Sequence, residues 1–583
     1  MLLQRLVERI ASEDLGPRGY AKLPVRYEVM LDRDGDPLGI ATLTGADDRR
    51  KDRGLVMYAP SVVRAAGIKP KLLTDTAEYA LGWGRPEKAE RYHQAFIDLV
   101  IACIDATQEP AVRAVGDYLS RPAEDRLPMP DDFDTSATVT FTVDGARPVD
   151  LPSVQAFWAH HSDRSVTSDG DGEAATQCIV CGERKPVLPR LPQMIKGVPG
   201  GQPSGTALIS ANNNAFASYG LTENFIAPTC SSCAELFCKS LNELLANEAS
   251  RLFLRPLVYV FWTREPVDLL FGSFMTRPDE GQVKALLQAV RSGKRGATDL
   301  DGNAFYCAGL TGNGGRVVVR DWIDTTVTQA QAHLARYFLL QRIVDRTGQP
   351  DRYYGVRALA GATTRTGGKD DPAPPVQQAL LRVALRGGPL PDALLAQTVR
   401  RVKVEQGVSQ PQAALIKMVL ASTIEDEQLE GYMVDLDETN RDAAYLCGRL
   451  LAVLDSIQRT ALGQRNATII DRFYGSASTA PIAVFGRLIG GAQPHLAKLR
   501  RTRPDAAFAL ERRMTEIMAG IGVFPRTLTL RQQGMFALGY YHQRAADARA
   551  VAERTAARKA AGAPASEVDD LVAEEMDDTT PDA

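Results

Sequence analysis

The sequence predicts an α+β protein: mixed α/β N-terminal and middle domains with an insert held by cysteine knuckles, followed by an all-α C-terminal helical bundle. Three observations lead to this prediction. Before residue 360, β-rich runs alternate with helix patterns. Two Cys-x-x-Cys pairs interrupt the middle of that region. Beyond residue 376 the pattern becomes almost wholly helical, with Pro, Asn or Thr at the helix starts.

A chain of 583 residues should hold two to four domains and bury an ample core. A segment rich in Gly, Thr, Asp and Pro separates the α/β part from the helical part. The expected parts are a mixed α/β domain at 1–135, a middle domain at 136–359, a linker at 360–376, a helical bundle at 377–545, and a frayed helix with a disordered acidic tail at 546–583.

The individual elements follow from local patterns. Tyr27–Asp32 is expected to form a strand, Glu87–Asp105 an amphipathic helix, and Ala137–Val143, which alternates apolar residues with Thr, a half-buried strand. The apolar runs Leu257–Trp262 and Val317–Val319 are expected to be central strands. Helices are expected at Pro375–Leu385, Pro391–Glu405, Pro411–Leu420, Asn440–Gln458 and Thr479–Ile489.

The two knuckles consist of Cys178 with Cys181 and Cys230 with Cys233. Two such pairs predict a four-thiolate site for one structural Zn²⁺ ion, because a two-residue spacer lets one turn offer both sulfurs. Cys238, His160 and His161 are alternative ligands. Disulfides are a weaker alternative: no signal peptide opens the chain, and eight cysteines in this length fit a reducing cytoplasm. No apolar run approaches the ~18 residues that a membrane span needs.

Charge is unevenly distributed. The formal net charge is -3, but the last 20 residues contain eight acidic and no basic residues. The segment Arg449–Arg544 holds 14 Lys and Arg against 5 Asp and Glu, a balance of +9. A basic helical segment suits phosphate backbones, although the solvated face of a bundle is a simpler explanation.

Motifs of common active sites are missing. The chain has no Walker A, G-x-S-x-G, H-E-x-x-H or G-x-G-x-x-G motif. Pro278-Asp279 could begin a nuclease triad, but the second carboxylate expected beside Lys284 is absent. These absences favour a binding subunit over an enzyme.

Five stretches, in order from about residue 67 to 543, resemble one known family. They are Gly67–Pro70 with Leu73, Asp75, Tyr79 and Leu81–Gly82; Ile195–Gly197 through Tyr219–Gly220; Asn313 with Arg316–Arg320; Asn466–Thr468 with Asp471–Ser478; and Gln533–Gln543. Together they resemble the Csd-type large subunit of type I-C CRISPR surveillance complexes (Cascade). The zinc prediction rests on the cysteines of this sequence and not on the resemblance.

The resemblance implies a cytoplasmic, non-enzymatic large subunit of an RNA-guided interference complex. Such a subunit would recognise the protospacer-adjacent motif in duplex DNA, help to separate the strands, hold the displaced strand and recruit the helicase-nuclease. Its partners would be crRNA, target DNA, the backbone and crRNA-processing proteins, and small subunits, with no membrane. The alternative is a stand-alone zinc-stabilised nuclease or nucleic-acid-modifying enzyme.

Two sets of residues are candidates for nucleic-acid contact. The Gly- and Asn-rich insert offers amides to base edges and glycines for close approach, and the Lys-Pro-Lys turn is a second candidate. The expected motif-reading set is Lys69, Lys71, Lys196, Gly200, Gly201, Gln202, Asn212, Asn213 and Asn214. The expected phosphate-binding set is Arg316, Arg320, Arg487, Lys498, Arg500, Arg501, Arg503, Arg512 and Arg513, the last seven in a region resembling the family's small-subunit-like domain. The simpler alternatives are a self-packed or solvated loop and arginines paired with nearby carboxylates such as Asp321 or Asp324.

Overall fold

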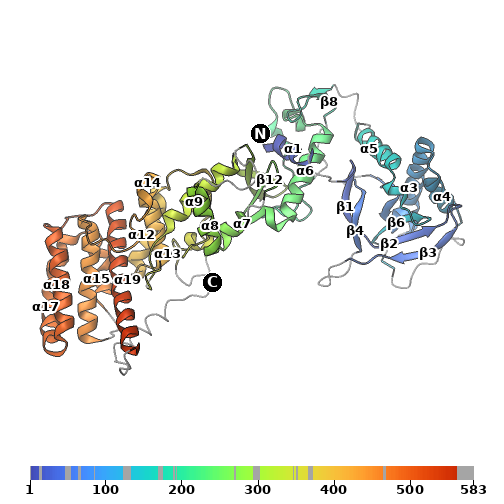
Figure 1. The fold of residues 1–583 in the computed structure, drawn as a ribbon. Helices are drawn as coiled ribbons and strands as arrows, with labels where there is room; N and C mark the ends of the chain where they lie inside the picture. Colours follow the sequence, from blue (N-terminus) through green and yellow to red (C-terminus); the bar gives the residue numbers. More distant parts are fainter. Residues whose placement is uncertain are drawn as a thin grey trace. The chain divides into compact units, whose positions relative to one another are not determined.

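The fold is that of a computed structural model (Figure 1). Contacts divide the chain into two compact units. Unit 1 comprises Met1–Glu243 with Gly312–Val318, and unit 2 comprises Leu244–Thr311 with Val319–Ala583. The structure describes residues 2–11, 16–45, 54–62, 67–84, 86–122, 133–134, 136–167, 175–187, 191, 194–267, 271–292, 302–345, 347–349, 352–365, 372–463 and 468–560. The predicted boundaries at 135, 359, 376 and 545 stay predictions.

Unit 1 begins with a helix and a two-stranded sheet, continues as a four-stranded sheet with helices, and ends in the cysteine region. The sheets are β1-β4, β3-β2-β6-β5 and β7-β8. Its elements are α1 Leu2–Ala11, β1 Tyr20–Val25, β2 Tyr27–Leu31, β3 Pro37–Thr42, β4 Leu55–Pro60, β5 Thr74–Thr76, α2 Ala77–Ala80, α3 Pro86–Thr107, α4 Pro110–Leu119, β6 Thr138–Val143, η2 Pro148–Asp150, α5 Pro152–Thr167, β7 Thr176–Gln177, β8 Arg184–Lys185, η3 Asn214–Phe216, η4 Glu223–Ile226 and α6 Ser231–Ala246.

The predicted strand at 137–143 is strand β6, but it is almost wholly buried instead of half-buried. It lies between β2, with which it runs parallel, and β5. Phe141 packs in the apolar core with Phe96. On the opposite face, the Thr140 hydroxyl hydrogen-bonds the Thr74 hydroxyl at 2.9 Å. Alternating Thr therefore marks a polar pair inside the fold and not a solvent face.

Unit 2 combines a four-stranded sheet, ordered β12-β11-β10-β9, with a long series of helices. One apolar core extends in sequence from Leu252 to Tyr541. Its elements are η5 Glu248–Ser250, β9 Arg251–Leu254, β10 Leu257–Thr263, α7 Phe271–Thr276, α8 Glu280–Ser292, β11 Ala304–Asn313, β12 Arg316–Thr326, α9 Val327–Gln341, α10 Val356–Gly361, α11 Pro374–Arg386, α12 Asp392–Glu405, α13 Gln410–Ala421, α14 Asp426–Leu429, α15 Ala443–Leu462, α16 Ile469–Ala477, η6 Pro481–Ala483, α17 Phe485–Thr502, α18 Pro504–Ile521 and α19 Leu530–Ala560.

Strand β10 is central, as predicted, because β9 and β11 both pair with it. The run Val317–Val319 is not a central strand: it belongs to β12, at the sheet edge, and the Val319 side chain is 39% exposed. A short apolar run fits a central or an edge strand equally well, because pairing partners are distant in sequence.

The helical prediction beyond residue 376 is confirmed, with one local difference. The segment predicted as one helix at 479–489 splits into η6 and the start of α17. Pro481 begins η6, and the next backbone N–H, that of Ile482, donates to the Pro525 carbonyl oxygen at 3.1 Å instead of continuing a helix. The predicted frayed helix after 545 is part of α19 as far as Ala560. The acidic tail, the centre of the linker at 366–371, and Asn466 with Ala467 lie outside the described residues.

Two glycines decide how α15 and α19 cross. A Cβ atom at Gly448 would lie 2.0 Å from the Phe536 carbonyl oxygen, and one at Gly539 would lie 2.1 Å from that of Tyr445. The helix backbones therefore touch at this crossing, which only glycine permits. Figure 1 shows the two helices side by side. None of the described helices combines the length and apolar character required for a membrane span.

Candidate metal centre and nucleic-acid interface

The two knuckles meet at one point. Cys178 and Cys181 flank a tight turn beside the β7–β8 hairpin, and Cys230 and Cys233 lie at the start of α6. Their four sulfur atoms all lie within 4.8 Å of one another, close enough to hold a metal ion. Among the described residues, this is the one group of three or more His, Cys, Asp or Glu side chains that is so arranged. The sequence prediction of the ligand set is thus supported by geometry, and the donor set fits tetrahedral zinc.

Backbone N–H groups point at the sulfur of Cys178. The N–H of Val180 donates to it at 3.5 Å and that of Cys230 at 3.4 Å. Burial by itself raises the pKa of the Cys178 thiol, but surrounding backbone N–H groups outweigh it and lower the pKa to about 7. A thiolate is the form that ligates a metal, and these donors favour it at Cys178, whereas burial raises the pKa of the Cys181 thiol in the same turn.

The alternative ligands lie outside this group. Cys238 is buried further along α6, where burial raises its thiol pKa to about 12. His161 stacks on Trp158, with ring centroids 5.9 Å apart. The neighbours of the four cysteines are instead apolar: Val180 with Leu3 and Val7 of α1. The centre therefore ties the first helix of the chain to α6.

The insert between the knuckles lies on the tip of the β11–β12 hairpin. Gly201 bridges to Gly314 and Ala207 bridges to Arg316, both in parallel register. The Gly312 N–H donates to the Pro199 carbonyl oxygen at 2.7 Å. These backbone hydrogen bonds and bridges fix residues 199–207 against residues 312–316. Sequence patterns did not indicate this pairing.

The insert glycines lie against the backbone of the β11–β12 hairpin. A Cβ atom at Gly200 would lie 2.9 Å from the Gly312 carbonyl oxygen, and one at Gly312 would lie 2.2 Å from the Gly201 nitrogen. Gly200 also has φ of +78°. These glycines let two protein backbones touch, and the predicted approach of Gly200 and Gly201 to DNA stays a prediction.

Three predicted residues from separate parts of the sequence come together at this hairpin tip. The Arg316 guanidinium donates to Asn212 Oδ1 at 2.5 Å and lies over the Phe216 ring, 4.5 Å from its centroid. The Gln202 N–H donates to the Gly314 carbonyl oxygen, and its exposed side chain lies beside Gly315. One amide-rich, singly charged surface results, which we call the tip cluster: Gln202, Asn212, Phe216 and Arg316.

Two features near the tip cluster were missed from the sequence. Phe216 is the ring that holds Arg316, and it is 41% exposed. Tyr219 is 100% exposed and has φ of +52°, next to Gly220 with φ of +75°. Positive φ at both central residues of a two-residue turn normally favours Asn-Gly, so the aromatic residue is unusual there. A Tyr-Gly pair within an Asn-rich segment was the available signal.

The remaining motif-reading candidates are distributed differently. The side chains of Asn213 and Asn214 are exposed, but Asn213 Oδ1 accepts from the Ala215 N–H at 3.3 Å and caps η3. Lys196 is exposed near the base of the insert, where its N–H donates to Asn242 Oδ1 at 2.8 Å.

Lys69 is exposed and Lys71 half-buried in a separate turn, in which the Lys71 N–H donates to the buried Asp75 carboxylate at 2.8 Å. The structure does not bring these two lysines to the tip cluster through any contact it records.

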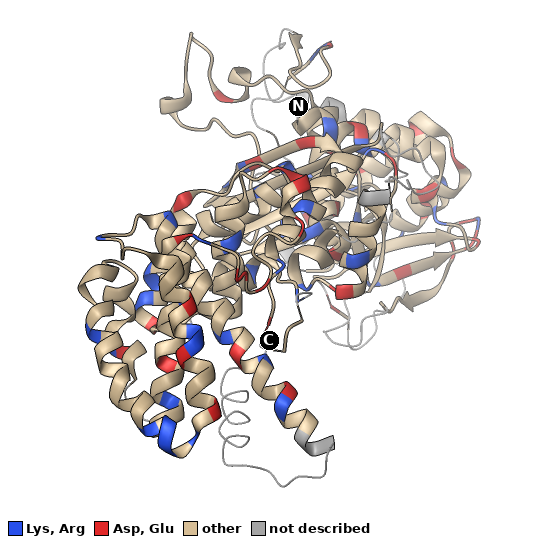
Figure 2. Ribbon diagram, turned by 60° about the vertical axis from the view of Figure 1, so that its left-hand side comes forward, with Lys and Arg blue, Asp and Glu red and all other residues tan. Residues whose placement is uncertain are grey.

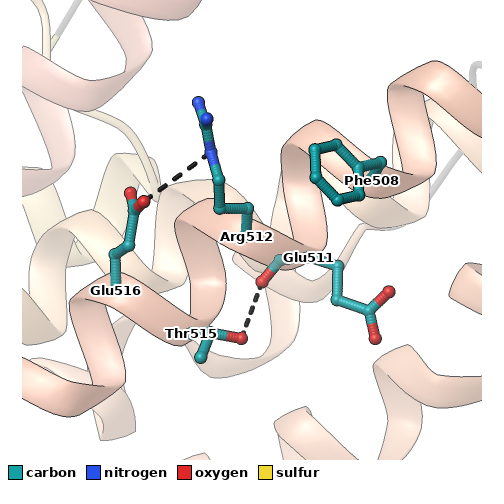
Figure 3. A pocket seen from close by; sticks show the side chains of 5 residues that line it. All are labelled: Phe508, Glu511, Arg512, Thr515 and Glu516. Carbon is teal, nitrogen blue, oxygen red and sulfur yellow. Dashed lines mark hydrogen bonds and ion pairs between the residues drawn. The ribbon is translucent and has the colours of Figure 1, made fainter.

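Most of the predicted phosphate-binding side chains of the bundle already have partners. Figure 2 shows Lys and Arg along these helices, interspersed with Asp and Glu. Figure 3 shows Arg512 turned toward Glu516, 3.6 Å away, with Phe508 exposed one turn before it. Further pairings are Arg487 over the Phe473 ring at 5.4 Å, Lys498 to the Ala461 carbonyl oxygen at 2.6 Å, Arg500 to Glu511 at 2.5 Å and Arg513 to Asp547 at 2.5 Å.

Arg501 and Arg503 differ from these five. Both are exposed at the α17–α18 turn, and no described residue pairs with their guanidinium groups. Arg320 is likewise exposed on β12, and Asp321, offered as its alternative partner, pairs with Arg382 at 3.4 Å. Fewer Lys and Arg side chains of the described bundle are thus available to phosphates than the net charge of the segment indicated.

In a comparison with protein families, a family model matches nearly the whole chain. The matching model is described as CRISPR-associated protein (Cas_Csd1), and it aligns with residues 3–547. The matched range includes the cysteine knuckles, the insert and the bundle. No match was found among curated proteins.

Proposed function

The chain belongs to the Cas_Csd1 family of CRISPR-associated proteins, and from this membership we propose that it is the large subunit of a type I-C Cascade complex. Its task is to recognise the protospacer-adjacent motif in duplex DNA and to help open the strands. Guide RNA then reads the long target by base pairing, so that the protein needs to recognise only a short motif and the duplex shape, as in other RNA-guided effectors.

The observation that carries this proposal is the tip cluster. Its members come from two stretches of the insert and from a distant hairpin, yet they meet on one surface. Amide and guanidinium groups are the side chains that read base edges. A surface with two amides and one cation suits sequence readout more than non-specific phosphate binding, which favours many cations.

The metal centre has a supporting role in this proposal. One zinc ion held by Cys178, Cys181, Cys230 and Cys233 would fix both ends of the 48-residue spacer. Four thiolates leave no open position on the ion, which is typical of structural zinc. The subunit itself is proposed to be non-catalytic, with cleavage supplied by the recruited helicase-nuclease.

The bundle is proposed to hold the displaced strand through its phosphates. Within the bundle, Arg501 and Arg503 are the best placed of the predicted set, because a phosphate would not have to displace a described partner from their guanidinium groups. Lys69 and Lys71 remain candidates for DNA contact away from the tip cluster. The proposed partners are crRNA, target DNA and the other Cascade proteins.

Co-purification with RNA and behaviour with DNA test the proposal together. The chain, expressed with its neighbouring genes and a repeat array, should co-purify with repeat-derived RNA and bind duplex targets that carry one short adjacent motif. The purified chain alone should leave DNA intact with Mg²⁺ or Mn²⁺. Cleavage by the isolated chain, with no RNA association, would instead support the stand-alone nuclease.

A further inference from the structure

We propose that Arg316 is a base reader and that it recognises a guanine of the adjacent motif through the guanine O6 and N7 atoms. The inference rests on the proposed function and assigns one base-specific contact to it. It also departs from the sequence prediction, which placed Arg316 among the phosphate-binding residues. Three observations carry it: how the side chain is restrained, what restrains it, and what surrounds it.

The Arg316 side chain is restrained on two sides. Its Nη2 donates to Asn212 Oδ1 at 2.5 Å, and the guanidinium plane lies over the Phe216 ring at 4.5 Å. A free arginine loses rotamer entropy when it is immobilised. Here the side chain is already restrained in the folded protein, so that less entropy remains to be lost on binding DNA. The planar guanidinium also keeps N–H donors that Asn212 does not use. A preoriented fork suits the two acceptors of guanine, whereas a phosphate contact needs no fixed plane.

Both restraining groups are neutral. An amide oxygen and an aromatic face hold the guanidinium without cancelling its charge, and no carboxylate of the described chain pairs with it. The paired arginines of the bundle, such as Arg500 with Glu511, show the opposite arrangement. Arg316 is therefore fixed in position like a structural arginine but remains a full cation, which is what contact with DNA requires.

The surroundings leave the approach to Arg316 open. Gly314 and Gly315 precede it at the hairpin turn and are exposed, and a Cβ atom at Gly314 would meet nothing within 4 Å. Gln202 lies beside Gly315, so a second side chain suited to a base edge stands next to the first. A turn formed by two exposed glycines carries no side chain that would block a groove, where base edges are accessible.

A guanine-analogue scan with the assembled complex tests the inference. Each guanine of the adjacent motif, on either strand, is replaced in turn by 7-deazaguanine, which lacks N7, or by inosine, which keeps O6 and N7 but lacks the minor-groove amine. We expect one 7-deazaguanine to weaken binding roughly 10-fold, because the loss of N7 leaves O6 as the only acceptor and breaks the bidentate contact. Inosine at the same position should have little effect.

The protein variants must match the analogue. Arg316→Gln should lower binding to the unmodified motif by a similar factor and should show no further loss with 7-deazaguanine, because one contact cannot be lost twice. Arg316→Lys keeps the charge but not the fork and should lose most of the discrimination. Arg320→Gln, on the same strand, is the matched control: it should weaken all duplexes alike and remain sensitive to 7-deazaguanine.

Each other outcome has a definite meaning. If the wild-type complex prefers a motif but ignores every 7-deazaguanine, or if Arg316→Gln keeps its sensitivity, the inference is wrong and the proposed function stands. If the wild-type complex shows no motif preference, the proposed function itself fails. Zinc content and thermal unfolding of each variant show whether the insert has folded; if Arg316→Gln fails there, Phe216→Leu replaces it, and unchanged analogue discrimination in that variant would also overturn the inference.

Discussion

The two units differ in what stabilises their fold and in which groups contact their arginine side chains. In unit 2 one apolar core spans most of the helices, and several bundle arginines, among them Arg500 and Arg513, pair with carboxylates. In unit 1 the cysteine region has a small apolar cluster of four buried residues, a metal-binding group and backbone pairing to a hairpin tip. Its arginine at that tip is held by neutral groups. The net charge of a segment therefore does not show which of its cations lack a carboxylate partner, because only the pairing in the structure does.

The largest expected effect breaks the core of unit 2. Gly539→Leu should destabilise unit 2 by at least about 3 kcal/mol, because the leucine side chain would clash with the Tyr445 carbonyl oxygen and push α15 and α19 apart. Gly486→Leu is the matched control, since nothing lies within 4 Å of a Cβ there. Denaturant unfolding followed by circular dichroism measures both. Equal stability of the two variants would contradict close backbone contact at this crossing.

Loss of the metal ion should destabilise unit 1. Cys178→Ser should abolish binding of one zinc ion and lower the unfolding temperature of unit 1, with unit 2 little changed, because the four sulfurs form one site. Cys238→Ser, on the same helix as Cys233, should retain the metal. Metal analysis of reduced protein and calorimetry provide the measurements. Zinc-free wild-type protein, or a Cys178–Cys181 disulfide in cytosolic material, would refute the prediction.

The insert amides should affect specificity more than affinity for arbitrary DNA. Gln202→Ala, or replacement of Asn212–Asn214 together by Ala, should weaken binding to motif-bearing duplexes by roughly 10-fold, as expected for lost base contacts. Binding to motif-free duplexes should change little, because phosphate contacts remain. Filter binding on both substrates separates the two. A parallel loss on both would assign these residues to folding or to non-specific contact.

The buried side chain of Lys417 should make the stability of unit 2 depend on pH. Burial lowers the pKa of Lys417 to about 7, while its Nζ donates to the Arg342 carbonyl oxygen at 2.5 Å. The unfolded lysine titrates at about 10.4, so between these pH values the unfolded chain binds a proton that the folded chain lacks, and stability from this group rises by about 1.4 kcal/mol per pH unit. Lys417→Met should therefore be more stable than wild type at pH 7, with an advantage that shrinks by pH 9. Urea unfolding at both pH values measures the difference, and an advantage independent of pH would refute this assignment.

The smallest effect should separate free from paired arginines within the bundle. Charge reversal of Arg501 and Arg503 should reduce strand opening several-fold and lower the salt slope by about 1 per lost phosphate contact. Reversal of Arg512 and Arg513, which pair with Glu516 and Asp547, should change the slope less. Permanganate reactivity of unpaired thymines, titrated against salt, follows the opening. Identical slopes in both variants would show that pairing does not select the strand-holding residues.

Sequence by itself determined the features that depend on neighbouring residues. Spacing identified the four cysteines, because a two-residue turn brings both sulfurs to one point without help from the rest of the fold. Periodicity and start signals located β10 and the helices after residue 376, since these patterns repeat within a few residues. The one helix placed wrongly, at 479–489, begins where a distant contact with Pro525 diverts the chain.

Tertiary structure alone decided which of these features meet. Residues about 100 positions apart, Asn212 and Arg316, form one contact because the insert pairs with a hairpin through backbone groups that every residue carries. The glycines at 200 and 312 are needed for that pairing, and composition could not distinguish this role from an approach to DNA. Local patterns encode periodicity and turn geometry, whereas long-range contacts depend on the fold as a whole. The cysteines could therefore be named from the sequence, but the tip cluster could not.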